Sequence, residues 1–218
     1  KKYTVYPFDS SIISLIFNCS DAVLSNKNIR RAIVSALDYP SLESDMGTVT
    51  AKGIIPHTMT LGTQSYRDII PSVKPYKNSD PQGLFAKGLN QLDAKKCAIT
   101  VLCTEKYETT VRKLMQSWQL SLGIKCNISV EVASDTDLSA RIKSKNYQIA
   151  LCDVSYSANT AFNALEGYTS TSKDNIVNFN DKNYDTMISD IKHSASLTDT
   201  AEKTLKAEKY LIDSAVMV

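Results

Sequence analysis

The side chains best suited to chemistry are few and scattered in this sequence. There are only two histidines, His57 in an irregular region and His193 near the end of an expected helix. Neither has the spacing of a metal-binding pair or of a base that serves a nucleophile. The sequence also lacks the G-x-S-x-G, Walker and G-x-G-x-x-G motifs, and its seven glycines form no phosphate-binding loop. These features argue against an enzyme, and we predict no catalytic residue, no metal site and no cofactor.

One segment does concentrate groups that bind ligands. A buried strand is expected at 147–154, and ligands of parallel α/β sheets meet the loops that leave the carboxyl ends of strands. The candidate ligand-binding residues around this strand end are Asp153, Ser155, Tyr156, Ser157, Asn159, Thr160 and Phe162. Their polar groups can hydrogen-bond a peptide backbone, while Tyr156 or Phe162 covers its side chains. Helix capping in a solvated loop explains the same composition equally well, so both interpretations stay open.

The five cysteines are an odd number, so at least one thiol is unpaired within a monomer. Cys97 and Cys103 belong to one expected strand and lie about 20 Å apart at strand rise, which is too far for a disulfide. Cys126 and Cys152 also fall in strand-like stretches. We interpret most of the cysteines as small buried apolar residues and expect at least two free thiols in the denatured protein.

The composition indicates which classes of binding partner are not expected. The 218 residues include 25 basic and 23 acidic side chains, with 43% hydrophobic and 22% charged residues, as in a soluble globular domain. Nucleic acid and anionic membranes need a concentrated basic surface, so neither is an expected partner. No apolar run approaches the roughly 20 residues that span a bilayer. Residues 1–11 lack the apolar core of a signal peptide and the chain has no initial Met, which indicates an excised piece or a processed form. The expected oligomeric state is a monomer.

The first part of the chain mixes regular and irregular segments. A strand is expected at 11–17, followed by a helix that Asn26 caps and Pro40 stops, with a short second helix from about Ser41. Residues 47–79 contain three prolines and three glycines without a lasting period, which predicts a long loop over the surface. A helix then runs from Pro81 to about residue 92.

From residue 97 onward the pattern becomes regular. Apolar runs and alternating residues predict strands at 97–103, 125–132 and 147–154, separated by helices at 106–122 and 136–145. This βαβαβ run predicts parallel pairing with right-handed crossovers. Trp118 lies on the apolar stripe of its helix and is expected in the core rather than as a stacking platform. Two helices follow at 181–194 and 199–215, the second with a capping box of Asp199 and Glu202.

Several stretches in order carry a family resemblance. They are Phe17-Asn18 with 28–38, Gly53-Ile54-Ile55-Pro56, residues 111–124, residues 147–162, Asn178-Phe179-Asn180 with Tyr184-Asp185, and residues 201–211. Together they span about residues 12–215 and resemble the peptide-type extracellular solute-binding proteins of ABC importers.

The resemblance implies a fold and a function. The expected fold is an α/β, βαβ-containing lobe with a mixed sheet flanked by helices, one half of a bilobal periplasmic-binding-protein-like fold. Residues 1–218 would be the single C-terminal, ligand-binding lobe, excised from a longer protein whose N-terminal lobe is missing here. The implied function is capture of a peptide or related small solute in the cleft between lobes for an ABC permease. The implied location is extracellular, as a lipoprotein or periplasmic protein.

The sequence departs from the family pattern at the expected site. The family's amine-binding Asp aligns with Ser155, and its usual proline aligns with Asn159. Asp153 lies two residues earlier and is the candidate substitute, so a free peptide amine as ligand is an open question. The alternatives are a peptide-sensing relative that does not feed transport, a nickel- or glycan-binding relative, and a hydrolase that uses Asp153 and Ser155.

Overall fold

The computed structural model describes residues 11–156 and 158–218. Short apolar runs and capped amphipathic stretches account for the elements of this part of the chain. In order they are β1 (Ser11–Phe17), α1 (Lys27–Ser35), α2 (Tyr39–Met46), β2 (Thr60–Leu61), β3 (Gln64–Ser65), α3 (Tyr66–Ile69), α4 (Pro81–Gln91), β4 (Cys97–Thr104), α5 (Glu105–Leu122), β5 (Cys126–Ala133), α6 (Asp135–Lys143), β6 (Ile149–Ser155), α7 (Ala161–Glu166), α8 (Lys182–Lys192) and α9 (Leu197–Ser214).

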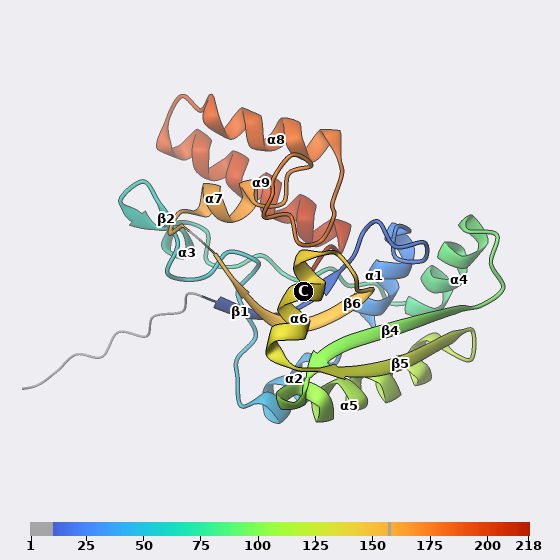
Figure 1. Ribbon diagram of the computed structural model, residues 1–218. Coiled ribbons are helices and arrows are strands. Elements are labelled where there is room, and N and C mark those ends of the chain that lie inside the picture. The colour runs from blue at the N-terminus through green and yellow to red at the C-terminus, as the bar shows by residue number, and fades with distance from the viewer. Residues whose placement is uncertain (1–10, 157) are drawn as a thin grey trace, which may run out of the picture.

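A four-stranded mixed sheet lies at the centre in the order β1-β6-β4-β5 (Figure 1). β4 pairs in parallel with both β5 and β6, which confirms the predicted βαβαβ run. β1 is antiparallel to β6. The outer side of β1 pairs with the last residues described, because Leu15 and Val218 exchange two backbone hydrogen bonds of 2.7 and 2.9 Å.

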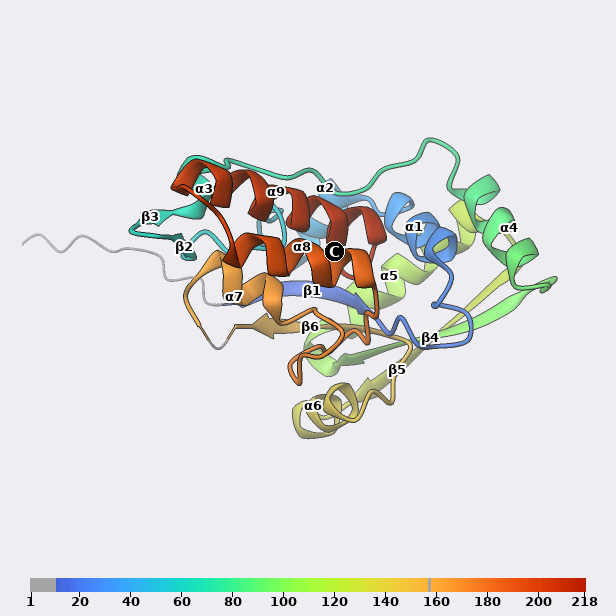
Figure 2. The ribbon, with the colours of Figure 1, turned by 90° about the horizontal axis from the view of Figure 1, so that it is seen from above.

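The sheet has an apolar core on each face, because alternate residues of a strand point to opposite sides. On one face Ile16, Leu102 and Ala150 pack against residues of α7, α8 and α9. On the other face Leu15, Val101 and Ile149 pack against residues of α1, α4 and α5. Helices therefore cover both sides of the sheet, with α7, α8 and α9 above it and α5 below it in Figure 1, while Figure 2 looks down on α8 and α9.

Trp118 belongs to the second core, as predicted. Its side chain is fully buried, and its indole Nε1 donates a hydrogen bond of 3.0 Å to the Ile33 carbonyl of α1. The buried donor is therefore satisfied, as the burial of a polar group requires. Leu120, two residues away on the same helix, is 88% exposed.

The segment from 47 to 79 is more than the surface loop that its composition predicts. It contains β2, β3 and α3, and several of its side chains are buried, namely Ile54, Ile55, Met59, Tyr66 and Val73. A buried ion pair of 2.5 Å joins Arg67 of this segment to Glu208 of α9. Gly53 passes beside this pair with a φ of +142°, and an added Cβ there would lie 2.4 Å from a Glu208 carboxylate oxygen. Only glycine fits at this position.

Several predicted helix ends differ from the structure. α1 ends before Pro40, and α2 already begins at Tyr39 with Pro40 in its first turn, where a missing N–H is tolerated. The cap of α9 lies three residues earlier than predicted. Ser196 Oγ accepts from the Asp199 N–H at 3.1 Å, and Asp199 accepts from the Ala195 N–H at 2.9 Å.

Two further local predictions were wrong or incomplete. The alternation of residues 125–132 predicts that Val132 points inward, but it is 42% exposed, because β5 is the outer strand of the sheet and its residues become more exposed toward its carboxyl end. The helix α7 was not predicted at all. Its six residues are too few to show a helical period, although Thr160 does cap it by accepting from the Asn163 N–H.

Candidate functional site

The carboxyl ends of β4 and β6 place a charged group at one edge of the sheet. Asp153 and Ser155 are both exposed and lie on the same face of β6. The first turn of α5 follows β4 directly and brings Lys106 and Tyr107 to Asp153. The Lys106 ammonium donates to the Tyr107 hydroxyl at 2.8 Å, and that hydroxyl donates to Asp153 Oδ2 at 3.0 Å. Lys106 Nζ lies 3.9 Å from the same oxygen.

In this group the Lys106 side chain stays charged, and the side chains of Lys106 and Asp153 are exposed to solvent. The hydrogen bond with Tyr107 raises the pKa of Lys106, and burial raises the pKa of Tyr107. Lys106 therefore stays a cation and Tyr107 a neutral donor at neutral pH. The side chains of Lys106 and Asp153 are 68% and 49% exposed, so an ion pair between them is weak. Each can exchange its partner for a charge on a ligand.

Tyr156 points away from this group. Its hydroxyl donates to the Ile54 carbonyl at 2.9 Å and lies 3.4 Å from the Tyr168 hydroxyl. Burial raises the pKa of Tyr156 to about 12. The side chain therefore joins the end of β6 to the segment around Ile54, and its hydroxyl is already used within the protein.

The rest of the predicted loop is largely occupied by its own structure. The Asn159 carbonyl accepts from the backbone N–H and the hydroxyl of Thr60, at 3.0 and 3.1 Å. Thr160 caps α7, and the Phe162 ring packs partly on the core with Lys192 Nζ 5.2 Å from its centroid. Ser157 lies outside the described residues. The structure thus brings Asp153 and Ser155 together, and gives Tyr156, Asn159 and Thr160 structural contacts.

Sequence reasoning missed Lys106 and Tyr107. The signal was present, because the rule that points to the carboxyl end of β6 points equally to that of the neighbouring parallel strand β4. Residues in the first turn after β4 lie at the same edge of the sheet.

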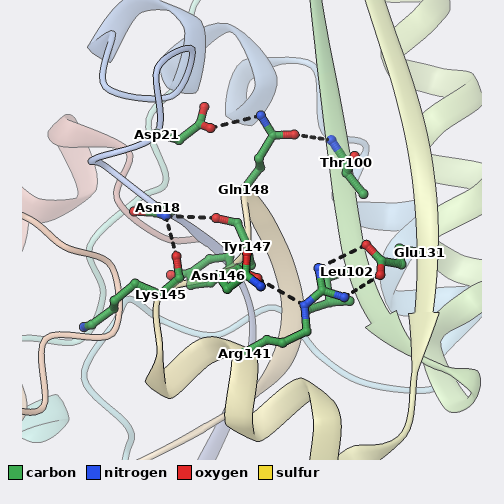
Figure 3. A pocket seen from close by; sticks show the side chains of 10 residues that line it. All are labelled: Asn18, Asp21, Thr100, Leu102, Glu131, Arg141, Lys145, Asn146, Tyr147 and Gln148. Atoms are coloured by element: carbon green, nitrogen blue, oxygen red, sulfur yellow. Dashed lines mark hydrogen bonds and ion pairs between the residues drawn. The ribbon is translucent and has the colours of Figure 1, made fainter.

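A polar cavity of about 310 Å³ lies at the opposite end of β6 (Figure 3). Its side chains pair with each other. Asp21 accepts from the Gln148 side-chain Nε2 at 3.1 Å, the Gln148 side-chain Oε1 accepts from the Thr100 backbone N–H at 2.7 Å, and Arg141 forms an ion pair with Glu131. Because these polar groups already have partners, the cavity offers little to a ligand.

A larger, mostly apolar cavity of about 660 Å³ follows the outer edge of β1. Its walls come from β1, α2 and the segment after α2, including Ile12, Leu42 and Met46. Two buried hydroxyls in its lining, those of Ser14 and Tyr39, have no hydrogen-bond partner among the described residues. None of the predicted site residues lines either of these two cavities.

Neither a membrane span nor a metal cluster accompanies this site in the described ranges. No helix there is long and apolar enough to cross a membrane. Within the same residues, no group of three or more His, Cys, Asp and Glu side chains is arranged to hold a metal ion.

The mixed sheet, its two helical layers and the polar strand ends define a periplasmic-binding-protein-like lobe. The chain belongs to the bacterial extracellular solute-binding proteins of family 5, because the model of that family's middle region matches residues 2–175. A comparison with curated proteins found no match in sequence.

Solved structures agree on the fold. The chain superposes on a peptide-binding protein of a peptide ABC transporter with a TM-score of 0.81 at 16% identity, covering 95% of this chain and 96% of that one. It superposes on the substrate-binding domain of an oligopeptide ABC transporter from Bacillus anthracis with a TM-score of 0.84 at 15% identity, covering 96% of this chain and 43% of that one. It superposes on Listeria monocytogenes OppA bound to peptide with a TM-score of 0.80 at 20% identity, covering 95% of this chain and 42% of that one. The chain thus spans less than half the length of the latter two.

Proposed function

We propose that residues 1–218 are the C-terminal, ligand-binding lobe of a two-lobed protein that captures peptides for an ABC importer and does not catalyse a reaction. Membership of the extracellular solute-binding family supports a binding role. Similarity of fold to an oligopeptide-binding protein solved with bound peptide supports peptides or closely related solutes as the ligand class. The second lobe would supply the other wall of the cleft.

The observation that carries this proposal is the group at the carboxyl ends of β4 and β6, in which Asp153, Ser155 and Lys106 are exposed and the buried Tyr107 joins Lys106 to Asp153. A peptide has an ammonium at one end, a carboxylate at the other and amides between them. Asp153 can accept from the ammonium, Ser155 can hydrogen-bond an amide, and Lys106 can pair with a carboxylate. Both ligand charges therefore find an opposite charge at one edge of the sheet.

The other predicted residues support this edge. Tyr156 anchors the end of β6 to the core, and Asn159 and Thr160 fix the start of α7. Phe162 and Ser157 remain candidates for contact with ligand side chains. The lobe would act as a monomer, outside the cytoplasm, in a lipoprotein or periplasmic protein that docks on an ABC permease.

Two alternatives differ in the fate of the bound ligand. A peptide-sensing relative would use the same site without delivering its ligand to a permease. A hydrolase would need a base for Ser155, yet no histidine hydrogen-bonds Ser155 or Asp153 in the described part of the chain. Incubating the protein with peptide and ester substrates distinguishes the hydrolase, since a binding protein leaves them intact.

The site itself can be mapped by NMR. Adding a free tripeptide to the ¹⁵N-labelled chain is expected to shift the amide signals of 106–107 and 153–156 and to leave that of Gln148 unchanged. The Asp153→Asn variant should raise the dissociation constant for the tripeptide about three- to fivefold, because it removes one exposed charge pair worth roughly 1 kcal/mol. An N-acetylated tripeptide, which has no ammonium, should bind the unmodified chain more weakly than the free tripeptide by a similar factor.

The matched control is Asp174→Asn, which removes an exposed carboxylate next to Asn175, whose carbonyl contacts Lys145 of the polar cavity at the other end of β6, and it should leave the titration unchanged. If Asp153→Asn and Asp174→Asn behave alike, Asp153 does not bind the ammonium. If the shifts cluster around Gln148 instead, the ligand occupies the polar cavity and the proposed site is wrong.

A further inference from the structure

Two cysteines lie opposite each other on neighbouring parallel strands. Cys97 is the first residue of β4 and Cys126 is the first residue of β5, and the strand register pairs them directly. Both side chains belong to the sheet face that packs against α5, where Cys126 is part of the core and Cys97 packs at its margin. At this end of the two strands, the Cys97 backbone N–H donates a hydrogen bond of 3.0 Å to the Lys125 carbonyl.

Neighbouring strands lie about 4.8 Å apart, which falls within the range of Cα separations, roughly 4.4–6.8 Å, that a disulfide spans. The two thiols also affect each other's ionisation. A hydrogen bond with Cys126 lowers the pKa of Cys97, and the same bond, together with burial, raises the pKa of Cys126. The proton thus stays on Cys126, and Cys97 is the sulfur that ionises first.

The other three cysteines are placed differently. Cys103 lies at the far end of β4 from Cys97, which agrees with the predicted separation of that pair. Cys152 belongs to the core on the opposite face of the sheet, and Cys19 follows β1. Cys97 is partly exposed, whereas Cys103, Cys126 and Cys152 are buried. Access from solvent and a nearby second thiol therefore coincide at Cys97.

We propose that Cys97 and Cys126 form a redox-active dithiol that closes to an interstrand disulfide in the presence of a low-molecular-weight disulfide. The Cys97 thiolate attacks one sulfur of the oxidant, so that a mixed disulfide forms and one thiolate leaves. Cys126 loses its proton and attacks the Cys97 sulfur, which releases the second thiolate. The protein gives up two protons and two electrons, and the oxidant is reduced to two thiols.

The bond would connect the first residues of the two strands that flank α5. It would close a loop that contains β4 and the whole of α5, and so constrain the unfolded chain. Because the strand register already holds the two residues opposite each other, the sheet would not have to rearrange.

The test treats the folded chain with glutathione disulfide and maps disulfides by mass spectrometry without reductant. We expect titratable thiols to fall from the five of the reduced chain by two, the mass to fall by two hydrogen atoms, and one cross-linked peptide pair that contains Cys97 and Cys126. The melting temperature should rise by several degrees, and dithiothreitol should reverse both changes.

Variants separate this bond from unspecific oxidation. Cys126→Ser should stop at a mixed disulfide that carries one glutathione on Cys97, while Cys152→Ser should still form the bond at the same rate. The proposal is overturned if the folded chain keeps all five thiols, if the cross-link joins other cysteines, or if the oxidised chain melts no higher than the reduced one. The first two outcomes are read on the unmodified chain and do not depend on whether a variant folds.

Discussion

Replacing Glu208 with alanine is expected to lower the free energy of unfolding by about 3–5 kcal/mol, because the change leaves the Arg67 guanidinium buried without a counter-charge. The two side chains are only 1% and 0% exposed. The Glu208 carboxylate also accepts from the Tyr66 hydroxyl at 2.9 Å and from the Ile55 N–H at 3.1 Å. Urea unfolding, followed by the fluorescence of the single tryptophan, measures the loss.

The matched control is Glu108→Ala, which removes one partner of an exposed ion pair with Arg112 on α5. It should change stability by no more than about 0.5 kcal/mol. A double variant, Arg67→Met with Glu208→Leu, should recover part of the loss, because well-packed apolar residues often replace a buried pair at little cost. Equal effects of Glu208→Ala and Glu108→Ala would show that the buried pair does not hold the segment around Ile55.

Truncating Trp118 should be equally severe. Trp118→Ala removes the largest fully buried side chain and is expected to cost about 3–5 kcal/mol. Trp118→Phe keeps most of the apolar volume but removes the indole donor, which leaves the Ile33 carbonyl only the longer 3.3 Å hydrogen bond from the Ala36 N–H, so its expected cost is smaller, about 1–3 kcal/mol. Circular dichroism during urea unfolding gives both values without relying on tryptophan fluorescence.

Leu120→Ala provides the comparison for Trp118, since Leu120 lies on the same helix but is 88% exposed. Its effect should stay within about 0.5 kcal/mol. Similar losses for Trp118→Ala and Leu120→Ala would mean that the packed face of α5 has been assigned to the wrong side.

The regular half of the fold could be predicted from the sequence because its signals are local. The alternation in β5 and the apolar stripe of α5 each repeat within a few residues, so they need no knowledge of the rest of the chain. The segment after α2 carries no such repeat. Its conformation depends on the contact between Arg67 and Glu208, which are 141 residues apart, and on the close passage of Gly53 beside them.

The arrangement of residues at the proposed site was predictable in part for the same reason. The end of β6 is a local feature, and the general position of ligands at strand ends pointed to Asp153 and Ser155. The inward turn of Tyr156 depends on the Ile54 carbonyl, 102 residues away. The contact of Asp153 with Tyr107 crosses 46 residues. Neither contact leaves a pattern in the residues around Asp153.

The central claim, that this chain is one lobe of a two-lobed peptide-binding protein, is tested most directly by calorimetry with a mixed peptide library. One lobe alone buries only part of a peptide and still pays for its lost translational freedom. We predict a dissociation constant weaker than about 1 mM, or less than roughly 4 kcal/mol of binding free energy, for the isolated chain. The two-lobed protein that contains it should bind in the micromolar range or tighter. Micromolar binding by the isolated chain would contradict the account, because it would mean that the site is complete without a second lobe.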